Sequence, residues 1–151
     1  IGNNISLCNP DISEKEMTEA AEAVGAMTFI NQLPGRFQYP VQERGSVLSM
    51  GQRQLISFLR AYVYKPSVLI LDEATSSVDS STEELITQAT AVLTKGRTSI
   101  VIAHRLATIQ DADKIIVLDH GEVMESGSHQ ELLAKNGPYK SLFEIQFNHV
   151  L

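Results

Sequence analysis

Two short stretches decide how this chain folds: residues 48–52 read Leu-Ser-Met-Gly-Gln, and residues 68–73 read Val-Leu-Ile-Leu-Asp-Glu. The second stretch is an apolar run that ends in two adjacent carboxylates, Asp72 and Glu73. A short apolar run of this kind predicts a buried strand of a parallel sheet. Ligands in open α/β sheets bind at the edge where such strands end. The sequence therefore predicts an α/β fold with acidic groups at a ligand-binding edge.

The stretch at 48–52 predicts the start of a helix. Ser49 and Gln52 have the spacing of a capping box, and apolar positions then recur on one face until Pro66. Free backbone N–H groups at a helix start attract an anion, and Gly51 lets it approach closely. Because the helix dipole contributes only about 0.3–1 kcal/mol near a surface, this site is expected to sense a phosphate held elsewhere. An ordinary capped helix is the alternative interpretation.

Other capping and turn signals set the remaining elements. Ser13 with Glu16 predicts a helix over about 13–24, and a helical turn is expected at 28–33, followed by a loop at 34–47. A helix capped by Ser81 and Glu84 is predicted to face inward with Leu85, Ile86, Ala89, Val92 and Leu93, and a buried strand is expected at 99–103. A hairpin is predicted at 115–125, with its turn at Asp119, His120 and Gly121. A short helix capped by Ser128 and Glu131 follows, and then a final helix with Tyr139, Leu142 and Phe143 on one face. This order indicates a helical lobe followed by part of an α/β core.

Composition narrows the function classes. The 151 residues suffice for one core or two small lobes, and a net charge of −6 argues against a nucleic-acid partner. Cys8 is the single cysteine, so no disulfide forms within the chain. The longest apolar runs fall far short of the roughly 20 residues that cross a bilayer. A soluble domain that does not itself enter the membrane is the expectation.

Three residues have the chemistry for phosphoanhydride hydrolysis. Such a reaction needs a Mg²⁺ anchor and a group that positions or deprotonates water. Asp72 and Glu73 divide these tasks if alternation along the strand turns one to the metal and the other to the water. His104 follows the neighbouring strand and would contact a γ-phosphate at the same edge. A solvated acidic pair and a packing histidine are the alternatives, and no Cys/His cluster has metal-ligand spacing.

Together these stretches resemble the motifs of ABC transporter nucleotide-binding domains. Residues 48–52 resemble the signature, 68–73 the Walker B motif, 77–79 the D-loop, and His104 the H-loop, in the order of the family. Residues 41–45 and 100–106 resemble the exporter branch, particularly multidrug and lipid exporters. The resemblance implies a partial P-loop NTPase-like fold: a helical subdomain at 1–66 with the signature, then the C-terminal part of a RecA-like parallel-sheet core at 67–151.

The resemblance also implies cofactors and partners. ATP and Mg²⁺ would be bound, with Asp72 holding the metal through water, Glu73 as general base and His104 on the γ-phosphate. A second nucleotide-binding domain would complete the site, and a transmembrane domain would be driven by it at the cytoplasmic face of the cell membrane. The binding residues of this chain are then Ser49, Gly51 and Gln52, facing ATP on the partner, and Asp79 at the dimer seam, while Glu43 and Arg44 lie near the coupling helices.

Two positions depart from the family pattern. Met50 replaces the usual first glycine of the signature, and Gln42 replaces the glycine usual before Glu-Arg-Gly. Met50 adds bulk near the partner's nucleotide. Either a heterodimer with unequal sites, in which this chain keeps Glu73, or a tolerated variant accounts for it, so homodimer and heterodimer both stay open.

The 151 residues contain no Gly-x-x-x-x-Gly-Lys-Ser/Thr phosphate loop. The first residues resemble the stretch just after the Q-loop of the family, so the chain is expected to be a C-terminal piece that is inactive alone. Its function would be ATP hydrolysis that powers export in the parent protein. These residues do not identify the transported substrate. The alternatives are a non-enzymatic interaction module and a non-transport ABC-type ATPase. Glu73 and His104 argue against the module, and the exporter-like 43–45 segment argues against the non-transport ATPase.

Overall fold

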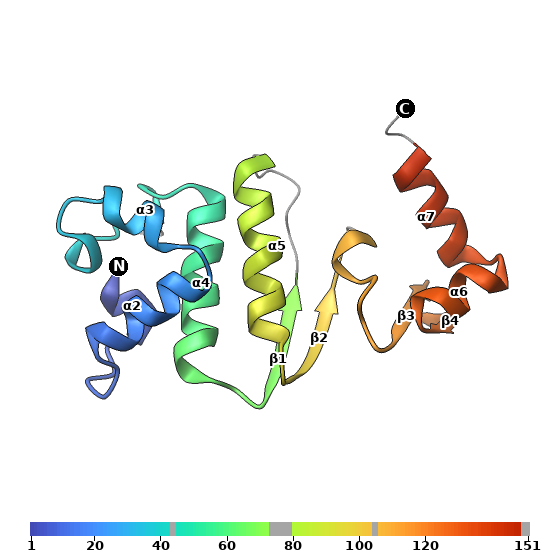
Figure 1. Cartoon of the computed structure of the whole chain (residues 1–151), viewed down its shortest axis with the longest axis horizontal. Coiled ribbons are helices and arrows are strands. Elements are labelled where there is room, and N and C mark those ends of the chain that lie inside the picture. The colour runs from blue at the N-terminus through green and yellow to red at the C-terminus, as the bar shows by residue number, and fades with distance from the viewer. Residues whose placement is uncertain (43–44, 73–79, 104–105, 149–151) are drawn as a thin grey trace. The chain divides into compact units, whose positions relative to one another are not determined.

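The structure is a computed structural model, and it describes residues 1–42, 45–72, 80–103 and 106–148. Packing divides the chain into two units, Ile1–Ile100 and Val101–Leu151. The first contains α1 (Gly2–Ser6), α2 (Glu14–Ala23), α3 (Met27–Gln32), the 3-10 turn η1 (Arg36–Gln38), α4 (Met50–Tyr64), β1 (Val68–Asp72) and α5 (Ser80–Thr94), and it ends within β2 (Thr98–Ile102) (Figure 1). The second contains η3 (Leu106–Thr108), β3 (Ile115–Asp119), β4 (Glu122–Gly127), α6 (His129–Lys135) and α7 (Pro138–Asn148). The predicted subdomain boundary between residues 66 and 67 lies inside the first unit and stays a prediction.

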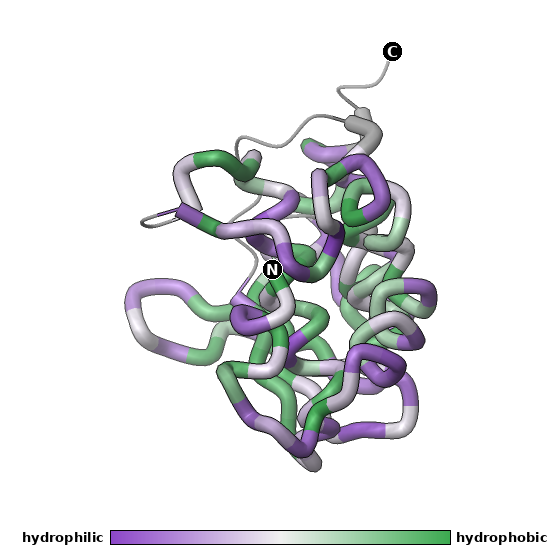
Figure 2. Tube along the Cα trace, turned by 90° about the vertical axis from the view of Figure 1, so that its left-hand side faces the viewer, coloured by the Kyte–Doolittle hydropathy of each residue, from purple (hydrophilic) through white to green (hydrophobic). Residues whose placement is uncertain are grey.

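Helix α4 is the centre of the first unit. It contacts α1, α2 and α5, and its residues Leu55, Ile56, Phe58 and Leu59 are buried. The members of the cluster around it that are 0% exposed are Ile5, Ala20, Ala21, Ala26, Ile30, Leu59, Ala89 and Leu93. Figure 2 shows the trace of this unit alternating between hydrophobic and hydrophilic residues, as expected for helices that bury one side. The predicted apolar face of the helix after the signature is confirmed.

Two predicted capping boxes outside the signature are formed. The hydroxyl of Ser13 accepts a hydrogen bond from the backbone N–H of Glu16, whose carboxylate accepts one from the backbone N–H of Ser13 at 2.8 Å. Ser128 and Glu131 make the same pair of bonds at the start of α6, the second at 2.8 Å. These bonds satisfy N–H groups that a helix start otherwise leaves without partners. The predicted starts of α2 and α6 are therefore confirmed.

These caps make stability depend on pH. The backbone N–H of Ser128 lowers the pKa of Glu131 below its usual 4.5, and the Ser128 hydroxyl adds to the effect. Because this pKa is lower in the folded state, Glu131 contributes to the stability of the fold above pH 4.5. That contribution is lost as the pH falls through the pKa that Glu131 has in the folded state. Glu131→Gln keeps acceptor and donor groups but does not titrate. We expect acid to lower the free energy of unfolding of the second unit, measured in urea, less in this variant than in the wild type. Identical pH profiles of the two proteins would contradict the expectation.

The strands β1 and β2 form a two-stranded sheet and run in the same direction (Figure 1). The prediction that both strands are buried is wrong. Leu69 is buried, but Ile70 is 65% exposed, Ile100 54% and Ile102 50%. Leu69 and Leu71 of β1 pack against the hydrophobic cluster of the first unit, and exposed residues alternate with less exposed ones along both strands. The apolar runs identified the strands, and their burial was overestimated because a covered second face was assumed.

Two smaller expectations also fail. Val92 is 37% exposed because Ala89 and Leu93, rather than Val92, face the hydrophobic cluster from α5. Helix α5 begins at Ser80, so Ser81 is inside the helix rather than at its cap.

The second unit is built on the predicted hairpin. Strands β3 and β4 are antiparallel, with Asp119 opposite Glu122, and the register shifts after Val117. The two turn residues, His120 and Gly121, have φ of 49° and 83°. Positive φ at both positions is the type I′ turn that matches the twist of a hairpin. Within the described ranges, no helix of either unit combines the length and apolar character that a bilayer span requires.

Candidate functional site

The start of α4 has the geometry that the signature stretch predicts. The backbone N–H of Gln52 donates to the Ser49 hydroxyl at 3.2 Å, and the backbone N–H of Ser49 donates to Gln52 Oε1 at 3.0 Å. Ser49 is exposed, Gly51 is buried, and Met50 is 45% exposed on the first turn. The capped start of α4 is therefore exposed to solvent at Ser49 and at the neighbouring Met50 side chain.

The charge at this helix start differs from that at the other two capped helices. The first turn of α2 contains Glu14 and Glu16, and the first turn of α6 contains Glu131. The first turn of α4 contains no acidic residue, because its box is closed by the neutral Gln52. A carboxylate at a helix start offsets the positive end of the dipole. The start of α4 retains that positive end, and an anion is the ligand that it favours.

Asp72 ends β1 and is exposed on the same side of the strand as Val68 and Ile70. In Figure 1, α4 runs in one direction and β1 returns in the opposite one, so the start of α4 and the end of β1 lie toward the same end of the first unit. The other predicted catalytic and binding residues, Glu73, Asp79 and His104, lie outside the described residues, as do Glu43 and Arg44.

Asp72 suits a magnesium site of a particular kind. The described part of the chain contains no group of three or more His, Cys, Asp or Glu side chains that would hold a metal ion by itself. Mg²⁺ is commonly held by one or two carboxylates together with water and substrate phosphates. The single exposed carboxylate of Asp72 fits that mode and does not make a metal site without a phosphate ligand.

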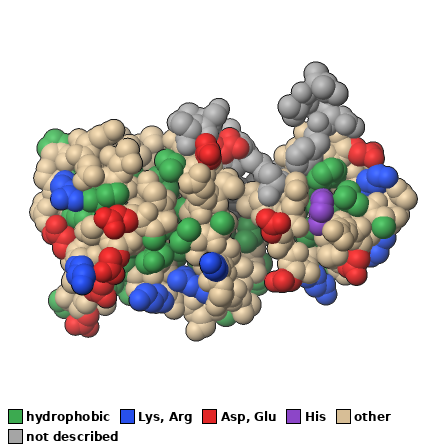
Figure 3. Space-filling view, in the orientation of Figure 1, with side chains coloured by type: hydrophobic (Ala, Val, Ile, Leu, Met, Phe, Trp, Pro, Cys, Tyr) green, Lys and Arg blue, Asp and Glu red, His purple; other side chains and the backbone are tan. Residues whose placement is uncertain are grey.

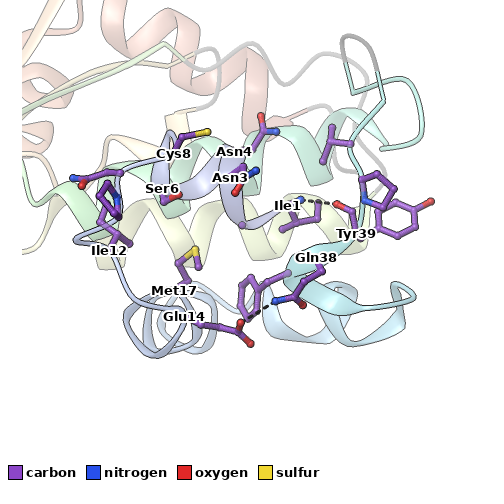
Figure 4. Close-up of a pocket in the computed structure, with 16 residues that line it drawn as sticks. Ile1, Asn3, Asn4, Ser6, Cys8, Ile12, Glu14, Met17, Gln38 and Tyr39 are labelled. Atoms are coloured by element: carbon purple, nitrogen blue, oxygen red, sulfur yellow. Dashed lines mark hydrogen bonds between the residues drawn. The ribbon is translucent and has the colours of Figure 1, made fainter.

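A cavity of about 750 Å³ lies elsewhere in the first unit, between α1, the start of α2 and residues 37–41 (Figure 4). Its walls include Asn3, Ser6 and Cys8, and a hydrogen bond from Gln38 to Glu14 spans one side. None of the predicted catalytic or binding residues lines it. On the face of the first unit shown in Figure 3, acidic and basic side chains are interspersed rather than separated by sign.

Comparisons with known proteins extend this geometry. The family model described as ABC transporter matches residues 3–76, which include the signature stretch and β1. An uncharacterized ABC transporter ATP-binding protein, YknV of Bacillus subtilis, is 53% identical over 148 residues, 98% of this chain and 24% of its own length. The chain belongs to the ABC transporter family. A probable multidrug resistance ABC transporter ATP-binding/permease protein, YheH of the same species, is 49% identical over 97% of the chain and 22% of its own length.

Solved structures agree with this assignment. A bacterial Atm1-family ABC exporter with ATP bound superposes with a TM-score of 0.83 at 39% identity, over 96% of this chain and 25% of that one. The fold is therefore that of part of an ABC ATPase domain, as predicted. The chain spans about a quarter of the length of the curated relatives that it matches.

Proposed function

We propose that this chain is the C-terminal part of the ATP-hydrolysing domain of an ABC exporter, and that the intact protein uses ATP to move a substrate across a membrane. The observation that carries the proposal is the capped, glycine-containing start of α4 without acidic residues, within a fold that superposes on an ATP-bound ABC exporter. An ordinary helix cap needs neither the buried Gly51 nor a neutral residue in place of glutamate.

The roles of the acidic edge follow from the chemistry of the reaction. Asp72 would hold Mg²⁺ through water, Glu73 would take the proton of the attacking water, and His104 would donate a hydrogen bond to the γ-phosphate. When bound, the metal neutralises part of the charge that develops on the phosphate oxygens.

The start of α4 would complete a site on a second copy of the domain. Ser49, Gly51 and Gln52 provide a hydroxyl, backbone N–H groups and a neutral amide, which suit a γ-phosphate held by other residues. Asp79 would lie at the seam between the two domains. A membrane domain, in the same chain or in a partner chain, would receive the resulting motion at the cytoplasmic face, with residues 43–44 near it.

The neutrality of Gln52 gives a direct test of the anion site. Gln52→Glu keeps an acceptor for the Ser49 N–H and adds a negative charge at the helix start. We expect stability to be unchanged or raised by about 0.3–1 kcal/mol. We expect kcat/KM for ATP in the intact protein to fall about tenfold, because a carboxylate would repel the phosphate. Gln130→Glu adds the same charge to the first turn of α6, so it should affect stability to a similar extent but leave kcat/KM unchanged; equal activity of the two variants would refute the anion site.

The proposed function is tested by reconstituting the intact protein in lipid vesicles and measuring ATP hydrolysis together with ATP-dependent movement of a panel of dyes. Hydrolysis with transport supports the exporter. Hydrolysis without membrane association would instead favour an ABC-type ATPase that serves another process. Absence of ATP binding and hydrolysis would favour an interaction module.

Met50 is 45% exposed at the proposed interface, where it would approach the partner's nucleotide. If the protein works in a heterodimer with unequal sites, the intact protein should hydrolyse ATP slowly alone and faster when mixed with a partner ABC subunit. Full activity of the protein alone would contradict the heterodimer and support a homodimer that tolerates methionine.

A further inference from the structure

One side chain of α4, Arg53, holds the turn that leads into the helix. Its Nη1 donates to the carbonyl oxygen of Leu48 at 2.6 Å and to that of Gly45 at 3.3 Å. The turn between them is closed by the backbone N–H of Leu48, which donates to the same Gly45 carbonyl at 2.9 Å. Because the backbone N–H of Arg53 also donates to the Ser49 carbonyl, the residue contacts the segment 45–49 at three points.

Packing against Gly45 supports the same arrangement independently of the hydrogen bonds. Gly45 is buried and has φ of +68°, a conformation that side chains disfavour. A Cβ atom at this position would lie 3.1 Å from Cδ and 3.5 Å from Cγ of Arg53. The aliphatic stem of Arg53 therefore occupies the space that the glycine leaves, and its guanidinium reaches past it to the two carbonyl oxygens.

Two more side chains of α4, Arg60 and Tyr64, also donate hydrogen bonds to backbone carbonyl groups, in this case those of α1. Arg60 follows Arg53 by seven residues and Tyr64 follows by four more, so all three share one side of the helix. Arg60 Nε donates to the Asn4 carbonyl at 2.5 Å, and its Nη2 donates to Asn4 Oδ1 at 2.9 Å. The Tyr64 hydroxyl donates to the Ser6 carbonyl at 2.7 Å. Arg60 thus fastens α1 to the far half of α4 and provides a matched comparison for Arg53.

We propose that Arg53 is a positioning residue that sets the orientation of Ser49 and Gly51 toward the nucleotide. It would do so by holding the Gly45–Leu48 turn against the first turns of α4. The role rests on the proposed function, since only there does the start of α4 meet ATP. Two accepting carbonyls engage the guanidinium, so Arg53 acts on the backbone of the site and not as a ligand of the phosphate.

The geometry requires arginine rather than any cation. One planar guanidinium reaches two carbonyl oxygens while its stem lies on Gly45, whereas a lysine ammonium is a compact group on a flexible stem. Lysine retains the charge and the packing of the stem but does not fix both acceptors. Arg53→Lys should therefore recover part, and not all, of the function that Arg53→Met loses.

The test compares Arg53→Met, Arg53→Lys and Arg60→Met in the intact protein, well below the unfolding temperature of each variant. We expect Arg53→Met to lower kcat/KM for ATP by on the order of tenfold to a hundredfold, because a small displacement of a binding group is costly. Arg60→Met, which also loses two hydrogen bonds of a guanidinium, should stay within about twofold of the wild type. Arg53→Lys should lie between the two.

Hydrogen exchange provides a readout that does not need turnover. In Arg53→Met the amides of Leu48 and Gln52 should exchange faster than in Arg60→Met, because both belong to the segment that Arg53 holds. Equal effects of the two methionine variants on kcat/KM and on these amides would overturn the positioning role while leaving the proposed function intact. An inactive wild-type protein would contradict the proposed function and this role together.

Discussion

Replacing Glu73 with glutamine in the intact protein is expected to reduce ATP hydrolysis by about a hundredfold or more while leaving ATP binding unchanged. Glutamine keeps the size and the hydrogen-bonding oxygen of the side chain but does not accept a proton at neutral pH. A general base of this kind contributes about 10²–10⁴ to the rate. Binding depends on the phosphate contacts and the metal, which the substitution does not remove.

Steady-state hydrolysis and nucleotide binding by fluorescence anisotropy measure the two halves of this expectation. Glu84→Gln, the same substitution at an exposed position of α5, should behave like the wild type in both assays. Hydrolysis by Glu73→Gln at the wild-type rate would remove Glu73 from the role of base, and loss of binding would indicate a structural role instead.

Truncating Leu59 to alanine is expected to lower the free energy of unfolding of the first unit by about 2–5 kcal/mol. Leu59 is fully buried in the middle of α4, the helix that α1, α2 and α5 all contact. Removing three carbon atoms there loses their burial and leaves a cavity between helices that are fixed by their other contacts. A loss of this size is a large part of the stability of an ordinary domain.

Urea unfolding followed by far-UV circular dichroism measures this loss. Leu7→Ala is the matched control, because it removes the same atoms from a side chain that is 60% exposed in the same unit. We expect it to change stability by less than about 1 kcal/mol. Similar losses in both variants would mean that α4 is not the centre of the packing.

The local elements of this fold follow closely from the sequence. Capping pairs such as Ser128 with Glu131, and the turn at His120 and Gly121, act within a few residues, so their spacing contains the information needed to predict them. Helix α1 is different. It has five residues and no side-chain cap, and contacts from Arg60 and Tyr64, more than fifty residues away, hold it in place. A pattern read along the chain does not contain such contacts.

Burial and the finer parts of the site were harder to predict. Ile70 and Ile100 identify strands, but which face of a strand is covered depends on what packs against the sheet, and periodicity does not specify it. At the site, the start of α4 agrees with the motif, whereas Arg53 was missed. An arginine four residues after the cap and eight after a glycine is a weak signal, because the two carbonyls that it binds become neighbours only when the turn forms.

In the proposed divided site, these residues would supply water activation and a γ-phosphate sensor, while another segment would hold the triphosphate. Titration of a fluorescent ATP analogue with Mg²⁺, into the 151-residue chain and into the intact protein in parallel, tests this directly. We predict micromolar binding to the intact protein and no saturation of the 151-residue chain below about millimolar ATP, because the chain contains no phosphate loop. Equal micromolar binding by both would contradict the account.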